Sequence, residues 1–343
     1  MKKNILLSLA IIAIILVVLL VIFKGTLSER LFSTPTPKTL TKITVAYTSV
    51  ASSKPEMAVA YKNKLFQKYG LDVHITEFSS GDLLARSLIG GKVDLVIVGQ
   101  DTYLKAAAAG SDIKSIGLVN SNTRWYFVAR KDIKDIKTYC TIGITTQDYL
   151  RGTNVLKKLG YDIKKLDIVN LASTNVCLDA LESNKVDSMA VSEVAWENFK
   201  MHNKDAANYK VIIKAFGNGY LTSPAAIIVT ANTLKNKKQS LENFSKAVIE
   251  ANYWLKTHSE SQIEIEIVGL ANITPNDAKI YAKIIDSQLE GIKFTQDLSN
   301  LEDIKVANEN VSPKLKDFDV KNFLSTQISD DLQKQKFLQK YGF

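Results

Sequence analysis

Polar side chains able to hold a small ligand follow the predicted strands of both halves of the chain. In the first half they are Thr48, Ser49, Ser79, Ser80, Gly81, Gly99, Gln100 and Asp101. In the second half they are Thr145, Thr146, Gln147, Ser173, Thr174, Ser192 and Glu193, and a later loop adds Tyr220 and Thr222. Hydroxyl and amide groups beside the free N–H groups of helix N-termini suit non-covalent binding of a small polar or anionic ligand.

Several of these residues also have a purely structural interpretation. Serine, threonine and aspartate are common helix caps, which applies to Ser80, Asp82, Asp101, Thr145 or Thr146, Ser173 and Thr174. Glu193 is the more specific candidate for ligand binding, because an unpaired carboxylate that faces a cleft lowers the stability of the protein. We expect it to meet a ligand amine or a lysine of the opposite lobe. Arg124 and Arg151, like Arg86, could bind an anion bidentately, although each is expected on the solvated surface.

Motifs for catalysis or metal binding are missing from the sequence. The histidines His74, His202 and His258 have no metal-ligand spacing, and there is no nucleophile elbow, Walker loop or dinucleotide glycine motif. We therefore expect a binder that is not an enzyme, with no catalytic residue, metal or cofactor. The only cysteines, Cys140 and Cys177, form no zinc motif, and whether they pair with each other is left open.

A repeated unit organises the elements that position these residues. The segment 79–101 reads as a polar cap, a short helix, a turn and a buried strand, and it recurs from residue 172. Lys92-Val93-Asp94 aligns with Lys185-Val186-Asp187, which places Asp94 and Asp187 in equivalent turns away from the ligand side. We interpret both aspartates as turn residues. A helix-turn-strand unit repeated after about 90 residues indicates two similar lobes.

Each half has the order β-α-β-α-β, which predicts an α/β fold with parallel strands and helical crossovers. Expected strands include 43–47, 71–78, 141–144 and 225–230, and expected helices include 55–69, 239–257, 274–290 and 320–341. Lobe 1 should comprise residues 42–128 plus about 222–343, and lobe 2 residues 129–221. Two chain crossings, near 120–131 and 216–224, predict a hinge that allows closure on a ligand. The ligand should bind at the carboxyl ends of the strands.

The N-terminus and the charge bear on localisation. The unbroken apolar run from Ile5 to Phe23 predicts a signal anchor over residues 1–24, or alternatively a cleaved signal peptide, followed by a proline-containing linker over 25–41. The body would then be extracytoplasmic, either held at the membrane or secreted or periplasmic after cleavage. A net charge of +9 without an arginine-rich block argues against nucleic-acid binding.

An ordered set of short segments adds a family resemblance. These are the strand 43–47, "GLDV" from Gly70, "FSSG" from Phe78, "GGKVDLVIVG" from Gly90 and "AAAAGSDIKSIG" from Ala106. Together they resemble the extracytoplasmic substrate-binding proteins of ABC importers, in the nitrate/sulfonate/taurine and thiamine-precursor branch. The second lobe departs from this pattern, since residues 191–196 lack an aromatic-rich turn.

The resemblance implies a two-lobed type II periplasmic-binding-protein fold with a hinge and a ligand cleft. It further implies a monomer that closes on a sulfonate, nitrate, taurine or pyrimidine-like ligand and delivers it to an ABC permease and its ATPase. Two alternatives stay open. One is an enzyme on the same scaffold in thiamine-pyrimidine biosynthesis, and the other is a membrane-tethered ligand sensor.

Overall fold

The computed structural model describes residues 39–48, 53–78, 81–120, 124–144, 146–203, 205–215, 224–289, 294–295 and 298–343. Residues Thr41–Phe343 form one compact unit. The expected signal anchor and most of the expected linker lie outside the described residues. Within the described part, no helix has both the length and the apolar character needed to span a membrane.

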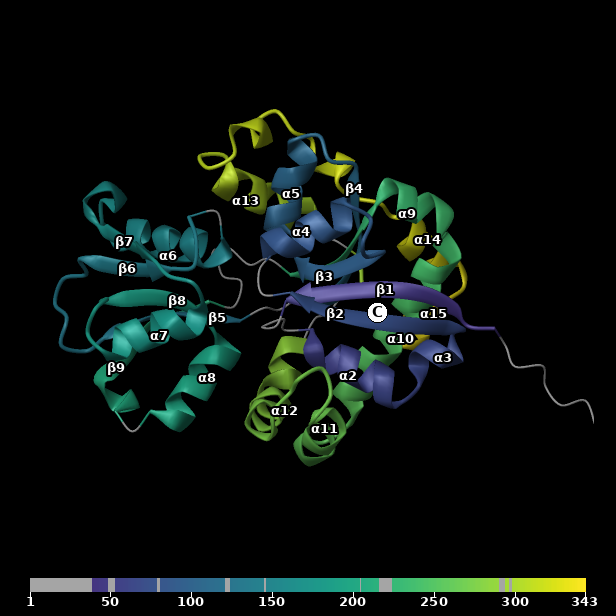
Figure 1. Cartoon of the computed structure of the whole chain (residues 1–343), viewed down its shortest axis with the longest axis horizontal. Helices are drawn as coiled ribbons and strands as arrows, with labels where there is room; N and C mark the ends of the chain where they lie inside the picture. Colours follow the sequence, from purple (N-terminus) through teal and green to yellow (C-terminus); the bar gives the residue numbers. More distant parts are fainter. Residues whose placement is uncertain are drawn as a thin grey trace, which may run out of the picture. The chain divides into compact units, whose positions relative to one another are not determined.

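The first of two five-stranded sheets has the strand order β2-β1-β3-β10-β4 (Figure 1). Its strands are β1 (Thr41–Thr48), β2 (Leu71–Phe78), β3 (Leu95–Gly99), β4 (Ile113–Asn120) and β10 (Ala225–Thr230). β1 is parallel to β2 and β3, as the helical crossovers predict, whereas β10 runs antiparallel between β3 and β4. Val45 and Tyr47 belong to one core cluster and Ala46 to another, because successive side chains point to opposite faces of a strand.

Helices cover both faces of this sheet, which explains why its central strands β3 and β10 are apolar on both sides, whereas the edge strand β2 alternates. α4 (Gly81–Ile89) and α5 (Asp101–Ala108) cover one face, and α2 (Lys54–Lys62), α3 (Leu65–Lys68) and α10 (Lys238–Thr257) cover the other (Figure 1). The helix expected over 55–69 is divided into α2 and α3. Lys64 causes the break, since its φ of 54° is incompatible with a continuous right-handed helix.

The second sheet repeats this arrangement with the order β7-β6-β8-β5-β9. Its strands are β5 (Trp125–Arg130), β6 (Thr138–Thr141), β7 (Asp167–Asn170), β8 (Ser188–Ser192) and β9 (Tyr209–Ala215). α6 (Gln147–Lys158) covers one face, and α7 (Thr174–Glu182) and α8 (Glu193–His202) cover the other (Figure 1). β6 is parallel to β7 and β8, which confirms the predicted α/β class and parallel repeat units.

The chain passes from the first sheet to the second between β4 and β5 and returns between β9 and β10. Both crossings fall in the segments expected to form the hinge. All of β5 pairs with β8 and β9 in the second sheet, so the boundary expected after residue 128 is placed too late. The strand patterns of β4 and β5 do not show that the two strands belong to different sheets.

The repeated aspartates fasten a turn to the first strand of each sheet. Asp94 Oδ2 accepts hydrogen bonds from the backbone N–H of Thr44, at 2.9 Å, and from its hydroxyl. Asp187 Oδ2 accepts from the backbone N–H groups of Lys137 and Thr138, both at 2.9 Å, and the Asp187 N–H donates to the Thr138 hydroxyl. The structural interpretation of this pair is therefore confirmed.

Helices also form most of the region after β10. Besides α10, they are α9 (Ala231–Asn236), α11 (Glu260–Ile267), α12 (Pro275–Leu289), α13 (Leu298–Asn308), α14 (Gln327–Lys334) and α15 (Phe337–Lys340). This region also contains the 3-10 turns η3 (Pro313–Leu315) and η4 (Val320–Asn322). Two further 3-10 turns, η1 (Ile163–Lys165) and η2 (Ala206–Asn208), lie in the second lobe. α10 and α12 agree with expectation. The helix expected over 320–341 is wrong, because Lys336 has a φ of 55° and separates α14 from α15.

Cys140 and Cys177 form a disulfide, with their Cα atoms 5.8 Å apart. The sequence alone left open whether these two cysteines pair. β6 is only four residues long, so Cys140 lies one residue from its carboxyl end, beside the first turn of α7 that carries Cys177. The disulfide thus joins α7 to the central part of the second sheet.

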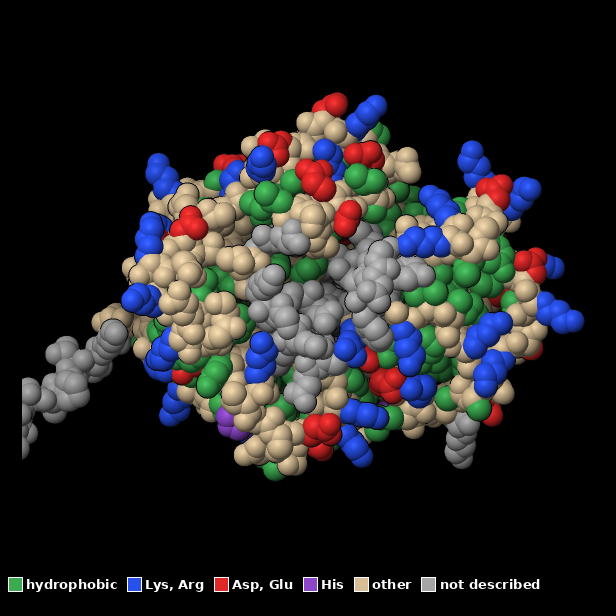
Figure 2. All heavy atoms as spheres, turned by 180° about the vertical axis from the view of Figure 1, so that it is seen from behind, with side chains coloured by type: hydrophobic (Ala, Val, Ile, Leu, Met, Phe, Trp, Pro, Cys, Tyr) green, Lys and Arg blue, Asp and Glu red, His purple; other side chains and the backbone are tan. Residues whose placement is uncertain are grey.

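Charged side chains are interspersed on the face seen in Figure 2. Lys and Arg side chains lie around the whole visible margin with Asp and Glu among them, and they do not gather into one basic stripe.

Candidate functional site

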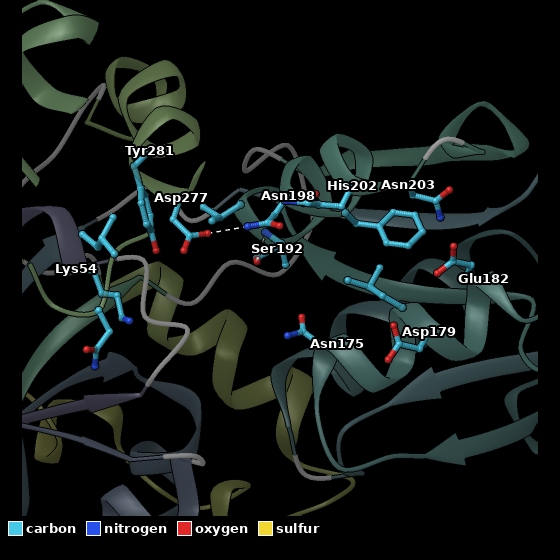
Figure 3. Close-up of a pocket in the computed structure, with 16 residues that line it drawn as sticks. Lys54, Asn175, Asp179, Glu182, Ser192, Asn198, His202, Asn203, Asp277 and Tyr281 are labelled. Atoms are coloured by element: carbon cyan, nitrogen blue, oxygen red, sulfur yellow. Dashed lines mark hydrogen bonds between the residues drawn. The ribbon is translucent and has the colours of Figure 1, made fainter. Parts of the chain in front are cut away.

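Among the described residues, side-chain contacts join the two lobes on two sides of the interface. On one side, Asp101 at the start of α5 accepts a hydrogen bond from Gln147 at the start of α6, at 2.7 Å. On the other side, Asn198 of α8 donates to Asp277 of α12, also at 2.7 Å (Figure 3). Asn276 and His202 lie 3.0 Å apart beside that bond. Helix N-termini and helix flanks of both lobes therefore enclose the space between the sheets.

A pocket of about 520 Å³ lies next to the α8–α12 contact. Its polar and charged lining residues are Lys54, Asn175, Asp179, Glu182, Ser192, Asn198, His202, Asn203, Asn272, Asp277 and Tyr281 (Figure 3). The α2 and α12 helices of the first lobe supply Lys54, Asp277 and Tyr281, whereas α7 and α8 supply most of the rest. The volume is in the range of small-molecule sites, which are about 300–1,000 Å³. We call this cavity the interlobe pocket.

The first-lobe wall of the interlobe pocket contains a buried ion pair and a buried tyrosine hydroxyl group. The Lys54 ammonium lies 3.4 Å from the Glu77 carboxylate, and it is largely buried. Burial raises the pKa of the Tyr281 hydroxyl above its ordinary value, and the carboxylates of Asp277 and Glu56 raise it further. Tyr281 is therefore a neutral hydroxyl at physiological pH. This wall therefore carries an ion-paired ammonium group, the Asp277 carboxylate and an uncharged hydroxyl group.

The α5–α6 side of the interface contains a buried guanidinium group. Arg151 is 8% exposed, and its guanidinium carbon lies 5.5 Å from the centre of the Trp125 ring. Burial lowers the pKa of Arg151 to about 10, against the opposing effect of Asp101, Asp148 and Tyr139. The expectation of a solvated surface position for Arg151 is thus wrong, because α6 turns this residue toward the sheet and not toward solvent.

The start of α6 explains a second difference from expectation. The Asp148 carboxylate accepts hydrogen bonds from the Thr141 hydroxyl, at 2.8 Å, and from the Ile142 N–H, at 2.9 Å. Gly143 has a φ of 153°, and the chain leaves the sheet at Thr141. The strand expected over 141–144 therefore spans Thr138–Thr141. Beyond Thr141, the backbone N–H of Ile142 therefore bonds to the Asp148 carboxylate and not to a neighbouring strand, and this bond holds the loop before α6.

The structure places most predicted ligand-binding residues at the ends of elements that face the interface. Thr48 ends β1, Gly81 begins α4, Gly99 ends β3, Gln100 and Asp101 open α5, Thr146 and Gln147 open α6, Thr174 opens α7, and Ser192 and Glu193 join β8 to α8. Ser49, Ser79, Ser80, Thr145, Tyr220 and Thr222 lie outside the described residues. Among the described ones, Asp101 and Gln147 meet directly, and Ser192 lines the interlobe pocket.

Local contacts account for some of these side chains. Ser192 and Ser173 each cap a helix, accepting hydrogen bonds from the N–H groups of Ala195 and Val176. Glu193 is buried, and it accepts a hydrogen bond of 2.6 Å from Tyr126 on its own lobe. Its protein partner is therefore a tyrosine and not a lysine of the opposite lobe. A neighbouring antiparallel strand brings Tyr126 there, and the sequence did not reveal that pairing.

Several pocket residues were missed by sequence reasoning. Lys54, Asn175, Asn198, Asp277 and Tyr281 are ordinary helix residues with no motif around them. The spacing of Asp277 and Tyr281 places them on one face of α12 and was visible in the sequence. Nothing local, however, shows that this face meets α8 of the other lobe. Among the described residues, no group of three or more His, Cys, Asp or Glu side chains could hold a metal ion.

This chain is similar in sequence to a curated relative and similar in fold to several solved structures. A curated relative, the "Putative binding protein YtlA" of Bacillus subtilis, is 24% identical over 238 residues, which cover 66% of this chain and 70% of the relative. Among solved structures, a putative sulfonate ABC transporter protein, the periplasmic sulfonate-binding protein SsuA of Methylobacillus flagellatus, matches with a TM-score of 0.68 and 14% identity. That match covers 87% of this chain and 96% of SsuA.

The periplasmic nitrate-binding protein NrtA of Synechocystis matches with a TM-score of 0.66 and 11% identity, over 87% of this chain and 90% of NrtA. At such low identities, these structures show a shared periplasmic-binding-protein fold. The family model described as "NMT1/THI5 like" matches residues 54–261, more than half of the chain. The sequence resemblance is thereby confirmed, and the chain belongs to the NMT1/THI5-like family.

Proposed function

We propose that this protein is an extracytoplasmic solute-binding protein that closes on a small polar ligand and delivers it to an ABC permease. The observation that carries the proposal is the interlobe pocket, since one cavity of about 520 Å³ takes its walls from both lobes. A ligand in such a cavity contacts both lobes and so stabilises their closed arrangement. Sulfonate, nitrate, taurine and pyrimidine-like solutes are the candidate ligands, and SsuA and NrtA are named as sulfonate- and nitrate-binding proteins.

The proposed location follows from two features. The apolar run from Ile5 to Phe23 would hold the body at the outer side of the cell membrane, or would direct its export if it is cleaved. The Cys140–Cys177 disulfide is typical of an oxidising compartment outside the cytoplasm. We propose that the protein acts as a monomer, because one chain supplies both walls of the pocket.

A solute screen tests the proposal. The full chain is titrated with nitrate, alkanesulfonates, taurine, pyrimidines and amino acids while thermal unfolding is recorded. A true ligand raises the melting temperature by mass action, by an amount that grows with its concentration. The bound solute is then recovered and identified by mass spectrometry. Recovery of the unchanged solute agrees with a binder, whereas a converted product would favour an enzyme on the same scaffold.

A matched pair of variants links binding to the pocket. Asn175 is an exposed residue of the first turn of α7 that lines the interlobe pocket, whereas its neighbour Val176 is 41% exposed and does not line it. Asn175→Trp should fill the pocket and abolish the ligand-induced rise in melting temperature. Val176→Trp should leave that rise intact. Equal responses of the two variants would show that the solute binds elsewhere.

A further inference from the structure

The end of the first lobe that lies away from the second sheet carries a group of exposed lysines. The starts of β1, β2, β3 and β4 and the end of β10 all lie at this end, because β10 runs antiparallel to its neighbours. Figure 1 shows β1 beginning here and pointing toward the second sheet. Six lysines of this end are exposed and form no ion pair with any described residue, and we call them the end-face lysines: Lys42, Lys64, Lys92, Lys235, Lys336 and Lys340.

The chain enters the body among these lysines. The Thr41 N–H donates a hydrogen bond of 2.9 Å to the Gly70 carbonyl oxygen. The Tyr69 ring, one residue before Gly70, packs edge-on against the Phe337 ring of α15, with 6.0 Å between the ring centres. Lys42 therefore lies at the same end of the lobe as α15, which carries one end-face lysine and follows directly after another.

Two ion pairs gather the remaining elements at this end. Lys237, just before α10, lies 2.7 Å from Asp94 in the turn before β3. Lys238, the first residue of α10, lies 2.6 Å from Asp331 of α14. Both aspartates are thus neutralised by lysines that do not belong to the end-face group, and the end-face charges stay uncompensated by them.

The charge at this end matches the excess charge of the whole body in size. Residues 1–40 contain five of the 44 Lys and Arg residues and one of the 35 Asp and Glu residues, which leaves the body with a net charge of +5. Two exposed carboxylates of this end, Asp72 and Asp330, have no lysine partner within the described chain, and the six end-face lysines exceed them. Lys and Arg side chains stand along the left margin of Figure 2, which is this end of the first lobe.

The proposed membrane anchor joins the body at the same end. The apolar run ends at Phe23, and the body begins at Thr41 with β1. The segment between them spans at most about 60 Å when fully extended, so an anchored body keeps its end-face lysines within reach of the membrane surface. The interlobe pocket lies beyond the opposite end of β1, where Lys54 begins α2.

We propose that the end-face lysines form a docking surface for anionic phospholipid headgroups, on which the first lobe of the anchored protein lies. This inference rests on the proposed membrane anchoring and adds the contact surface and the lipid chemistry. A lysine close to an anionic membrane favours the bound state about fivefold, and several lysines on one end act together. Because the pocket and the hinge lie away from this surface, the second lobe stays free to open and close on a solute.

Vesicle co-sedimentation of residues 41–343 tests the surface without the apolar run. All four core clusters of the described chain take their buried members from residues 43–341, so this part retains its core. At about 0.1 M salt, it should bind vesicles of phosphatidylcholine with about one third phosphatidylglycerol at least about tenfold more tightly than vesicles of phosphatidylcholine alone. Binding should be lost at about 1 M salt, where the Debye length falls to about 3 Å. Equal binding to both vesicles, or binding to neither, would overturn the inference.

A matched pair of double variants locates the surface. Lys92→Gln/Lys235→Gln removes two end-face lysines, whereas Lys164→Gln/Lys165→Gln removes two exposed lysines of the second lobe and changes the net charge equally. The first pair of substitutions should weaken binding to the phosphatidylglycerol vesicles about tenfold or more, and the second should weaken it less than about threefold. Equal weakening would show a response to net charge alone and would overturn the assignment of this face.

Lysine acylation with mass spectrometry tests the same surface in the full chain, reconstituted in lipid nanodiscs. Lys42, Lys92 and Lys336 should react several-fold more slowly in discs that contain phosphatidylglycerol than in discs of phosphatidylcholine, while Lys164 and Lys165 react alike in both. Identical rates for all five would overturn the inference. The solute screen decides separately on the binding function, since a solute held in the interlobe pocket should bind with the same affinity in the presence and absence of vesicles.

Discussion

Replacing Glu56 with glutamine should remove much of the pH dependence of this protein's stability. Glu56 lies in the first turn of α2 and is 0% exposed, and neither of its carboxyl oxygens has a hydrogen-bond partner among the residues that the structure describes. Burial disfavours its charged form and raises its pKa from 4.5 to about 8, against a smaller opposing effect of its own backbone N–H. At neutral pH, the folded chain therefore holds a proton on Glu56 that the unfolded chain releases.

The sign and size of the effect follow from this difference. Because the folded state binds more protons than the unfolded state between pH 4.5 and pH 8, the free energy of unfolding falls as the pH rises through that window. One pKa unit corresponds to about 1.4 kcal/mol, so the whole window corresponds to about 5 kcal/mol, most of which falls between pH 5 and pH 8. Glutamine has a similar volume and does not titrate.

Urea unfolding at several pH values measures the effect. Between pH 5 and pH 8, the wild-type chain should lose about 3–4 kcal/mol more stability than Glu56→Gln, equivalent to a difference of about 5–6 °C in melting temperature for a chain of this length. Glu260→Gln, at an exposed position in the first turn of α11, is the control and should behave as the wild type does. If the free energy of unfolding changed with pH in the same way for the wild type and Glu56→Gln, the reasoning would be refuted. That result would show that Glu56 has the same pKa in the folded and unfolded states.

Three further changes test the packing of the second lobe. Loss of the disulfide in Cys177→Ser, or by reduction, should lower the free energy of unfolding by about 4 kcal/mol, from the entropy of a loop that spans 37 residues. Gly152→Ala would place a Cβ atom 2.0 Å from the Tyr139 hydroxyl and should cost about 1–3 kcal/mol in urea unfolding. Asp187→Ala leaves two backbone N–H groups without their acceptor and should cost about 1–3 kcal/mol in the same assay.

Each of these changes has a matched comparison. Reduction should leave Cys177→Ser unchanged, and Gly81→Ala should be well tolerated because its nearest neighbour atom is 3.9 Å away. Asp94→Ala removes the equivalent acceptor in the first lobe, where Thr44 loses both its bonds, and should be destabilising to a similar degree. A neutral Asp187→Ala would show that water replaces the carboxylate in these turns.

The repeat illustrates what a single sequence reveals well. The Val-Asp pairs at 93–94 and 186–187 marked equivalent helix-turn-strand units, and the structure shows why the aspartates recur: each one fastens its turn to a threonine at the start of a parallel strand. That interaction is fixed by the geometry of a β-α-β unit, so the sequence pattern carries it. The misplaced boundaries arose at Lys64 and Lys336, where non-glycine residues adopt a left-handed conformation.

The candidate site was only half visible from the sequence. Strand ends and helix starts predicted Gln147, Asp101 and Ser192 as interface residues, because parallel strands bring their carboxyl ends to one edge of a sheet. The burial of Arg151 was not visible, since its helix alternates polar and apolar residues in a way that also fits an exposed position. Nor was the disulfide, because the length of β6 depends on where Asp148 ends the strand.

The sequence by itself determined the fold class, the two repeat units and the residues at their ends, because these depend on local periodicity, capping and turn chemistry. Only the tertiary structure decided which side chains of the two lobes meet: Gln147 with Asp101, and Asn198 with Asp277. These partners are 46 and 79 residues apart in the chain. Their meeting depends on how the two lobes pack across the hinge crossings, and no local pattern encodes that arrangement.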